Sequence, residues 1–183
     1  MVKTGEIWRL FKEEKENPEK WFVENGVKGG VYPSSFSSSC ASDKEIVAAE
    51  KETNTEFSSS YKYYLKEFGG GAPTCFQVYG IKKERKDYPD RYTVTGMTNH
   101  YRHEQNWPGT HEWYVVCSDH DGNPYGVDKD GKVWISDHDT QEIILVADDF
   151  EEFLYLLYTD TMWDNGYRKV IPWDEYLEKH KNK

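Results

Sequence analysis

Long apolar runs are absent from this sequence of 183 residues. The longest purely aliphatic run, residues 143–147, is far shorter than the roughly 20 apolar residues that a membrane-spanning helix needs. Residues 1–11 contain the charged side chains of Lys3, Glu6 and Arg9 among their apolar ones. They therefore lack the continuous apolar stretch of a secretory signal. We therefore expect a cytoplasmic protein with no membrane partner.

Cysteine is also scarce. The chain has only Cys40, Cys75 and Cys117, an odd and widely spaced set that excludes a disulfide framework and a paired-cysteine zinc site. Cys117 lies within an apolar segment, where a structural thiol is more common than a nucleophile. A reducing cytoplasm fits this cysteine usage.

Signatures of catalysis are missing as well. Residues 69–71 are all glycine, but they follow a predicted helix instead of joining a strand to one, so they indicate a helix end and not a phosphate-binding loop. His100 and His103 have the spacing HxxH without the glutamate that a zinc protease requires. The sequence predicts no enzymatic activity and no cofactor.

Basic residues are fewer than acidic residues in this chain. The chain has 33 acidic and 23 basic residues, and residues 119–152 alone carry 11 acidic and 2 basic residues. Such a surface repels phosphate backbones, so we expect no nucleic-acid partner. A basic protein or a cation is the partner that this charge favours.

Aromatic residues, by contrast, are abundant: 7 Trp, 14 Tyr and 8 Phe supply a hydrophobic core and exclude a disordered chain. Helices are predicted by apolar spacing of i, i+3, i+4 and by capping residues. Ser42 and Glu45 form a capping box, and Asp148 is a candidate cap for a later helix. The predicted helices begin near residues 7, 18, 43, 61, 149 and 172, with a Ser-rich linker at residues 32–39.

Short segments rich in β-branched and aromatic residues follow Pro73 and predict strands. They are residues 74–81, 91–97, 112–118, 124–128, 132–136 and 142–146. Residues 98–111 are predicted to be a long polar loop. Helices, an antiparallel meander and a C-terminal helix together predict an α+β fold.

The tetrapeptide SDHD occurs twice, at residues 118–121 and 136–139. In a meander the two copies follow strands that run in the same direction, so both reach one edge of the sheet, roughly 10 Å apart. Aspartate and histidine are ligands of zinc and manganese, which would allow a metal-dependent hydrolase. Aspartate is equally a common turn residue, and turn formation is our preferred interpretation, with no metal bound.

Three segments follow one another in the chain: YKYYLKEFGGG, YVVCSDHDGNPYGVDKDGKVWISDHD and ADDFEEFLYLL. Their order resembles that of the SUKH superfamily, which includes yeast regulators of cell-wall synthesis and killer resistance and many bacterial immunity proteins. The resemblance covers residues 42–158. This sequence lacks the Leu-Pro dipeptide that is common in the superfamily before the second helix. It implies a single SUKH-like domain at 42–158, with an N-terminal extension and linker at 1–41 and a C-terminal tail at 159–183.

The resemblance implies a binding protein. Many bacterial members neutralise the toxic C-terminal domain, often a nuclease, of a secreted or contact-delivered toxin. The alternative within the superfamily is a scaffold of the cell-wall-regulator type. A partner with cationic groups for phosphate agrees with the acidic surface of this chain.

We predict that the partner binds at the edge of the sheet where the two SDHD copies lie. The contact residues are Asp119, Asp121, Asp137 and Asp139, with Trp107 or Trp134 as an aromatic anchor. Two alternatives stay open: the acidic turns only keep the protein soluble, and Trp134 is a core ring.

Overall fold

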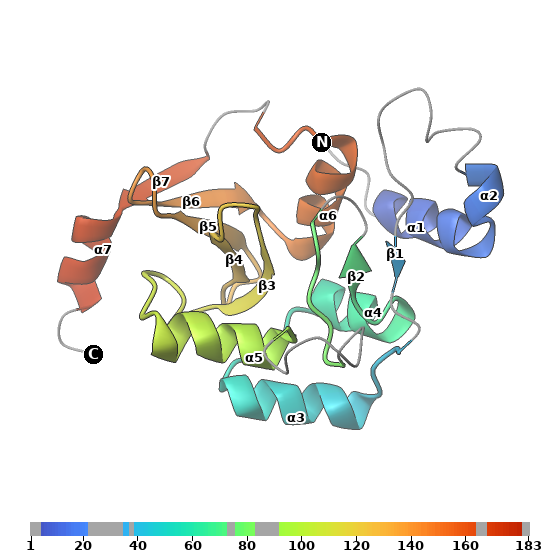
Figure 1. Cartoon of the computed structure of the whole chain (residues 1–183), viewed down its shortest axis with the longest axis horizontal. Coiled ribbons are helices and arrows are strands. Elements are labelled where there is room, and N and C mark those ends of the chain that lie inside the picture. Colours follow the sequence, from blue (N-terminus) through green and yellow to red (C-terminus); the bar gives the residue numbers. More distant parts are fainter. Residues whose placement is uncertain are drawn as a thin grey trace.

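The computed structural model describes residues 5–21, 35–36, 39–72, 76–82, 92–163 and 168–180. An antiparallel sheet of five strands in the order β3-β4-β5-β6-β7 lies at the centre of the described chain (Figure 1). The predicted α+β fold is confirmed. The strands are β3 (Tyr114–Ser118), β4 (Pro124–Val127), β5 (Val133–Asp137), β6 (Glu142–Ala147) and β7 (Lys169–Pro172).

Helices pack around this sheet. Figure 1 shows α3 alongside α5 and α4 beside α6, with α7 next to β7 on the far side of the sheet from α1. The described helices are α1 (Glu6–Glu16), α2 (Pro18–Trp21), α3 (Asp43–Thr53), α4 (Ser59–Glu67), α5 (Val94–Asn99), the π-helix η2 (His100–Glu104), α6 (Phe150–Thr159) and α7 (Trp173–His180). None of the described helices is long and apolar enough to cross a membrane.

The helix caps agree with the sequence, with one correction. The predicted capping box begins α3: Glu45 accepts a hydrogen bond from the Ser42 backbone N–H at 2.8 Å, and Ser42 Oγ accepts from Glu45 N–H. The cap of α6 is Asp149, not Asp148, because the carboxylate of Asp149 accepts from Glu152 N–H at 2.8 Å. Each cap satisfies a backbone donor that the helix leaves free.

The strand predicted at residues 91–97 is wrong, since the described part of that segment enters α5. Thr93 accepts a hydrogen bond from Gly96 N–H at 3.1 Å and so begins the helix. Val94, Met97 and Thr98 then face the interior at helical spacing. The β-branched run at residues 93–95 suggested a strand, but the threonine cap and the burial on one helical face decide the structure.

The long loop predicted at residues 98–111 is also partly wrong, because α5 and η2 extend to Glu104. The segment predicted as a strand at 74–81 is described only from residue 76, and there Val78 forms an isolated bridge with Gly71. Most of the predicted linker at 32–39 lies outside the described residues. Within it, β1 (Ser35–Phe36) pairs with β2 (Gly71–Ala72).

The two faces of the sheet carry two separate apolar clusters. In β6, Ile144 and Val146 belong to the main core, whereas Ile143 and Leu145 point to the other face. That second cluster contains Trp113, Trp134, Ile143, Leu145 and Tyr176. The alternation follows from the two-residue period of a strand, and it means that α7 covers the second face with Tyr176.

Both ends of the described chain contribute to the fold. Ile7 and Phe11 of α1 are fully buried in the main core. At the other end, β7 pairs with β6 and extends the sheet by an edge strand. Strand β7 was not predicted, because its short segment KVIP shows no alternation of apolar and polar residues.

Candidate functional site

The two SDHD copies lie at the same end of the sheet, as predicted. Asp119 directly follows β3 and Asp137 ends β5, and both strands are antiparallel to β4 between them. Strands β3 and β5 therefore run in the same direction. We call this end, with residues 118–121 and 136–139, the SDHD edge.

One buried side chain ties the two copies together. The amide Nδ2 of Asn123 donates to Asp119 Oδ2 at 2.9 Å, while its Oδ1 accepts from the backbone N–H of His138 at 3.0 Å. Asn123 is 3% exposed. A role for Asn123 was not predicted from the sequence. Its position in a turn, directly after Asp121-Gly122, was the signal that could have indicated one. The tie fixes the spacing of the two acidic turns.

The aspartates of the SDHD edge divide into two kinds. Asp119 Oδ1 accepts from the backbone N–H groups of Asp121 and Asn123, and Asp137 Oδ1 accepts from those of Asp139 and Thr140. These two carboxylates hold the turns, which supports the turn interpretation. The side chains of Asp121 and Asp139 are exposed. Across the described ranges, no three His, Cys, Asp or Glu side chains are grouped to hold a metal ion.

Trp107 lies at this same edge. Its indole Nε1 donates to the carbonyl of Ser136 at 3.1 Å, and its ring meets the rings of His138 and Trp173 edge-on at 5.8 and 6.0 Å. The ring is half-buried. Five of the six predicted contact residues, namely Trp107, Asp119, Asp121, Asp137 and Asp139, are therefore gathered in one region.

Trp134, the sixth residue, lies elsewhere. It stands near the start of β5, at the opposite end of the strand from Asp137, and is only 8% exposed. Its Nε1 donates to Asp128 Oδ2 at 2.7 Å, and its ring stacks on that of Trp113 at 6.3 Å. It is therefore a ring of the second cluster and not an exposed anchor at the SDHD edge.

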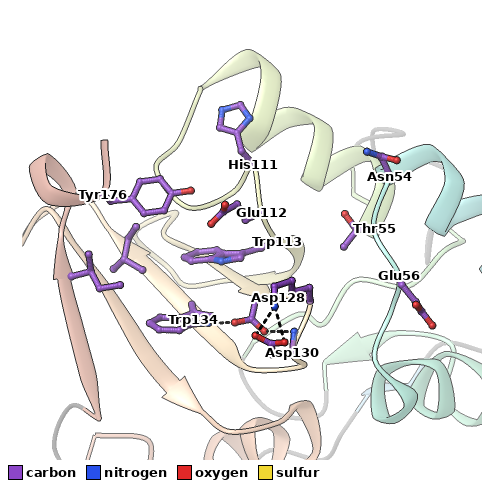
Figure 2. Close-up of a pocket in the computed structure, with 13 residues that line it drawn as sticks. Asn54, Thr55, Glu56, His111, Glu112, Trp113, Asp128, Asp130, Trp134 and Tyr176 are labelled. Carbon is purple, nitrogen blue, oxygen red and sulfur yellow. Dashed lines mark hydrogen bonds and ion pairs between the residues drawn. The ribbon is translucent and has the colours of Figure 1, made fainter. Parts of the chain in front are cut away.

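A pocket of about 530 Å³ opens at the end of the sheet where Trp134 lies (Figure 2). Figure 2 shows the parallel rings of Trp113 and Trp134, with Tyr176 on one side and Thr55 on the other. The pocket is lined by Asn54, Thr55, Glu56, His111, Glu112, Trp113, Asp128, Lys129, Asp130, Trp134, Ile143, Ile171 and Tyr176. We call it the tryptophan pocket.

Two glycines position the ring of Trp113 in the tryptophan pocket. A Cβ added at Gly109 would lie 2.4 Å from the Trp113 ring, and one at Gly126 would lie 2.7 Å from Trp113 Cβ. Neither distance is possible between non-bonded carbon atoms, so only glycine leaves room for the tryptophan. Arg102 fixes the backbone here by donating to the carbonyls of Trp113 and Thr53, at 2.7 and 2.6 Å.

Helix α7 closes one side of the pocket. The ring of His180 stacks on Tyr176 at 4.1 Å, and His180 Nε2 lies 3.2 Å from Glu112 Oε1. Burial and the nearby Glu112 carboxylate raise the pKa of Tyr176, which stays a neutral phenol. Burial and the charge of Arg102 lower the pKa of His111, so its imidazole is neutral at pH 7.

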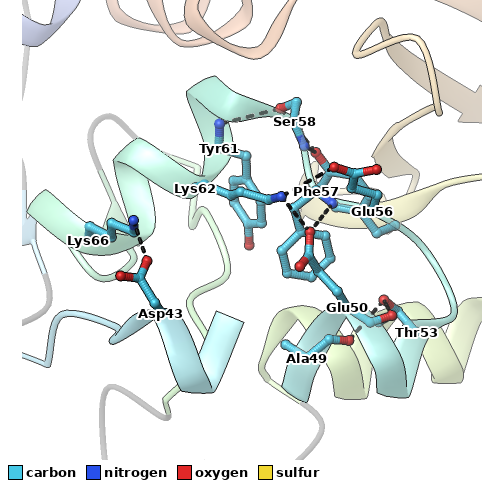
Figure 3. Close-up of polar contacts among 11 residues, drawn as sticks. Asp43, Ala49, Glu50, Thr53, Glu56, Phe57, Ser58, Tyr61, Lys62 and Lys66 are labelled. Carbon is cyan, nitrogen blue, oxygen red and sulfur yellow. Dashed lines mark hydrogen bonds and ion pairs between the residues drawn. The ribbon is translucent and has the colours of Figure 1, made fainter. Parts of the chain in front are cut away.

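The opposite wall is held by the connection between α3 and α4 (Figure 3). The Glu50 carboxylate accepts from the backbone N–H of Phe57 at 2.7 Å and pairs with Lys62 at 2.8 Å. Phe57 is 2% exposed and anchors the connection in the core. These contacts place Thr55 and Glu56 along the pocket.

One family model matches the chain. The model of the SMI1 / KNR4 family (SUKH-1) matches residues 40–156, which is most of the chain and includes the SDHD edge and much of the tryptophan pocket. No curated protein matches the sequence. The order of α4, strands β3 to β5 and α6 is the order of the three segments that carried the resemblance. The chain belongs to the SMI1 / KNR4 family (SUKH-1).

Proposed function

We propose that this chain is an immunity protein that binds the toxic domain of a cognate toxin and blocks it by occupying the site of its substrate. Membership of SUKH-1 supports a protein-binding role without catalysis. The observation that carries the proposal is the SDHD edge. There the exposed carboxylates of Asp121 and Asp139 project from two turns that Asn123 ties together.

This arrangement suits a basic partner. A nuclease presents cationic groups to the phosphates of its substrate, and a fixed set of carboxylates can bind those same groups. Because Asp119, Asp137 and Asn123 already hold the turns, little conformational entropy is lost when a partner docks. Complementary charge also raises the association rate constant, toward values on the order of 10⁸ M⁻¹s⁻¹ at low salt.

Affinity capture tests the partner. The immobilised chain is exposed to a lysate of its source cells at low and at moderate salt, and the retained proteins are identified. We expect one basic polypeptide, held near one-to-one and ending in a nuclease-like domain. Several unrelated proteins held weakly would instead favour a regulatory scaffold and contradict the proposal.

A charge reversal tests the surface. Asp121→Lys with Asp139→Lys changes two exposed carboxylates that hold no turn, so the fold is preserved. We expect association with the captured toxin to slow about tenfold at low salt, with a weaker salt dependence. The control, Glu16→Lys with Glu52→Lys, makes the same change in net charge at exposed positions of α1 and α3. Equal rates for both variants would exclude the SDHD edge from the interface.

A further inference from the structure

The tryptophan pocket has a chemistry of its own, separate from the SDHD edge at the other end of the sheet. Carboxylates outnumber cations along its lining. Lys129 is the lysine of the lining, and His111 is neutral at pH 7 because burial lowers its pKa. The acidic residues of the lining are Glu56, Glu112, Asp128 and Asp130. The pocket therefore carries a net negative charge.

Ion pairs offset only part of that charge. Glu56 lies 3.6 Å from the ammonium group of Lys62, but the Glu56 side chain is 88% exposed. Asp128 accepts hydrogen bonds from the backbone N–H groups of Asp130 and Lys132 and from the Trp134 indole, all of them neutral donors. Asp130 pairs with Lys129 at 2.9 Å, but that lysine side chain is 83% exposed. An exposed ion pair of this kind contributes little free energy, so Asp130 can readily exchange Lys129 for another cation. The lining can therefore accept a further cation.

Aromatic rings beside the carboxylates add a second attraction for cations. Trp113, Trp134 and Tyr176 line the pocket. The ammonium group of Lys169 lies 5.6 Å from the centroid of the Trp134 ring, which is the geometry of a cation–π contact. A planar guanidinium can stack on a ring and pair with a carboxylate at the same time, which an ammonium cannot.

We propose that the tryptophan pocket binds the side chain of an arginine carried by a segment of a protein partner. A second cavity of about 390 Å³ adjoins the pocket and shares Glu56, Asp128, Lys129 and Asp130 with it. It continues past the β4–β5 turn to residues 58–60 and Asp149. A polypeptide with its arginine in the pocket can therefore continue along the adjoining cavity. The site does not depend on the partner being a toxin.

The test uses the whole chain and short peptides. The indole N–H signals of Trp113 and Trp134 are followed by NMR while Ac-Gly-Gly-Arg-Gly-Gly-NH2 is added. The control peptide carries citrulline, which has the shape of arginine without its charge. We expect saturable shifts of both signals with the arginine peptide, with a dissociation constant on the order of 1 mM, and at least fivefold weaker binding of citrulline.

Two variants should change the affinity in opposite directions. Asp130→Asn with Glu56→Gln removes two negative charges at exposed positions and should weaken binding of the arginine peptide about fivefold. Lys129→Gln removes the cation that pairs with Asp130 and should tighten binding about two- to threefold. Glu16→Gln with Glu52→Gln, on exposed faces of α1 and α3, should leave the affinity unchanged.

Three results would overturn the proposal. The first is an absence of shifts at the Trp113 and Trp134 indoles up to about 20 mM peptide, well above the affinity expected for one such side chain. The second is equal binding of the citrulline and arginine peptides. The third is an affinity that does not differ between Lys129→Gln and the Asp130→Asn, Glu56→Gln variant. None of these results bears on capture of a toxin at the SDHD edge, so the two proposals fail separately.

Discussion

Trp113 shows how one residue can organise a binding pocket. It is 4% exposed, it stacks on Trp134, and it fills the space above Gly126 in β4. Its carbonyl accepts from Arg102, which is itself buried and donates to Thr53 and Thr110 as well. The position of the ring is thus set by two glycines and one cation, and small changes at those residues should be costly.

Gly126→Ala should destabilise the protein. The added Cβ would lie 2.7 Å from Trp113 Cβ and Cε3, so the tryptophan or the strand must move. We expect the free energy of unfolding to fall by about 1–3 kcal/mol, as for other overpacked sites. Urea denaturation followed by tryptophan fluorescence measures this change.

Gly122→Ala is the comparison for that variant. No atom lies within 4 Å of a Cβ added at Gly122, but its φ is +86°, so its substitution measures backbone strain alone, about 1–2 kcal/mol. The tryptophan fluorescence of the folded protein should change with Gly126→Ala, which displaces Trp113, and not with Gly122→Ala. An unchanged free energy of unfolding for Gly126→Ala would show that Trp113 is loosely held.

At the scale of elements, local signals in the sequence predicted the helix starts well. Ser42 and Glu45 form the capping box of α3, and Ser58 caps α4 by accepting from Tyr61 N–H. Such caps involve residues three apart and need no tertiary contact. There are two exceptions. The cap of α6 is Asp149 instead of Asp148, and the threonine cap of α5 was hidden among β-branched residues that favour a strand.

The α3 capping box should make stability depend on pH. Hydrogen bonds from the Ser42 hydroxyl and backbone N–H to the carboxylate lower the pKa of Glu45 to about 2. Since the folded-state pKa lies below the unfolded value of 4.5, the stabilisation is complete above pH 4.5 and is lost as the pH falls toward 2. We expect Glu45→Gln to be less stable than the native chain at pH 7 and equally stable near pH 2.

Urea denaturation of both proteins at several pH values between 2 and 7 measures this dependence. Glu52→Gln is the matched control, because Glu52 is an exposed residue of the same helix. A difference between the native chain and Glu45→Gln that is the same at every pH would show that the charge of Glu45 has no part in the cap.

At the scale of the whole molecule, segments outside the family match contribute to the core. Family similarity covers residues 40–156, yet α1 buries Ile7 and Phe11 in the main cluster. In the same way, β7 pairs with β6, and α7 covers the second cluster with Tyr176. We therefore predict that these segments fold together with the matched region.

Phe11→Ala tests this prediction. The ring is fully buried and contacts the rings of Phe36, Phe68 and Tyr158, from three different parts of the chain. We expect the free energy of unfolding to fall by about 3–5 kcal/mol in a single transition. Chemical denaturation followed by fluorescence and by circular dichroism measures it, with the exposed Glu16→Ala of the same helix as the control.

A separate unfolding step for α1 would contradict the prediction. In that case Phe11→Ala would lower the protection of α1 amides from hydrogen exchange and leave the main transition in place. Residues 1–41 would then be an extension of the domain, as the sequence first suggested.

Features that depend on neighbouring residues could be predicted from the sequence. The apolar stripes, the caps and the alternating short segments predicted most of the helices and strands β3 to β6. Because the turns between those strands are short, the sequence also determined that both SDHD copies reach one end of the sheet. The preference of aspartate for turns was equally readable.

Tertiary structure alone decided which residues meet across long distances in the chain. Asn123 joins the two SDHD turns only because β3 and β5 both flank β4. Trp134 lies in the second cluster because Trp113 and Tyr176 pack on its face of the sheet. No pattern of neighbouring residues encodes such contacts, since burial of a ring depends on what packs over it and not on its own segment.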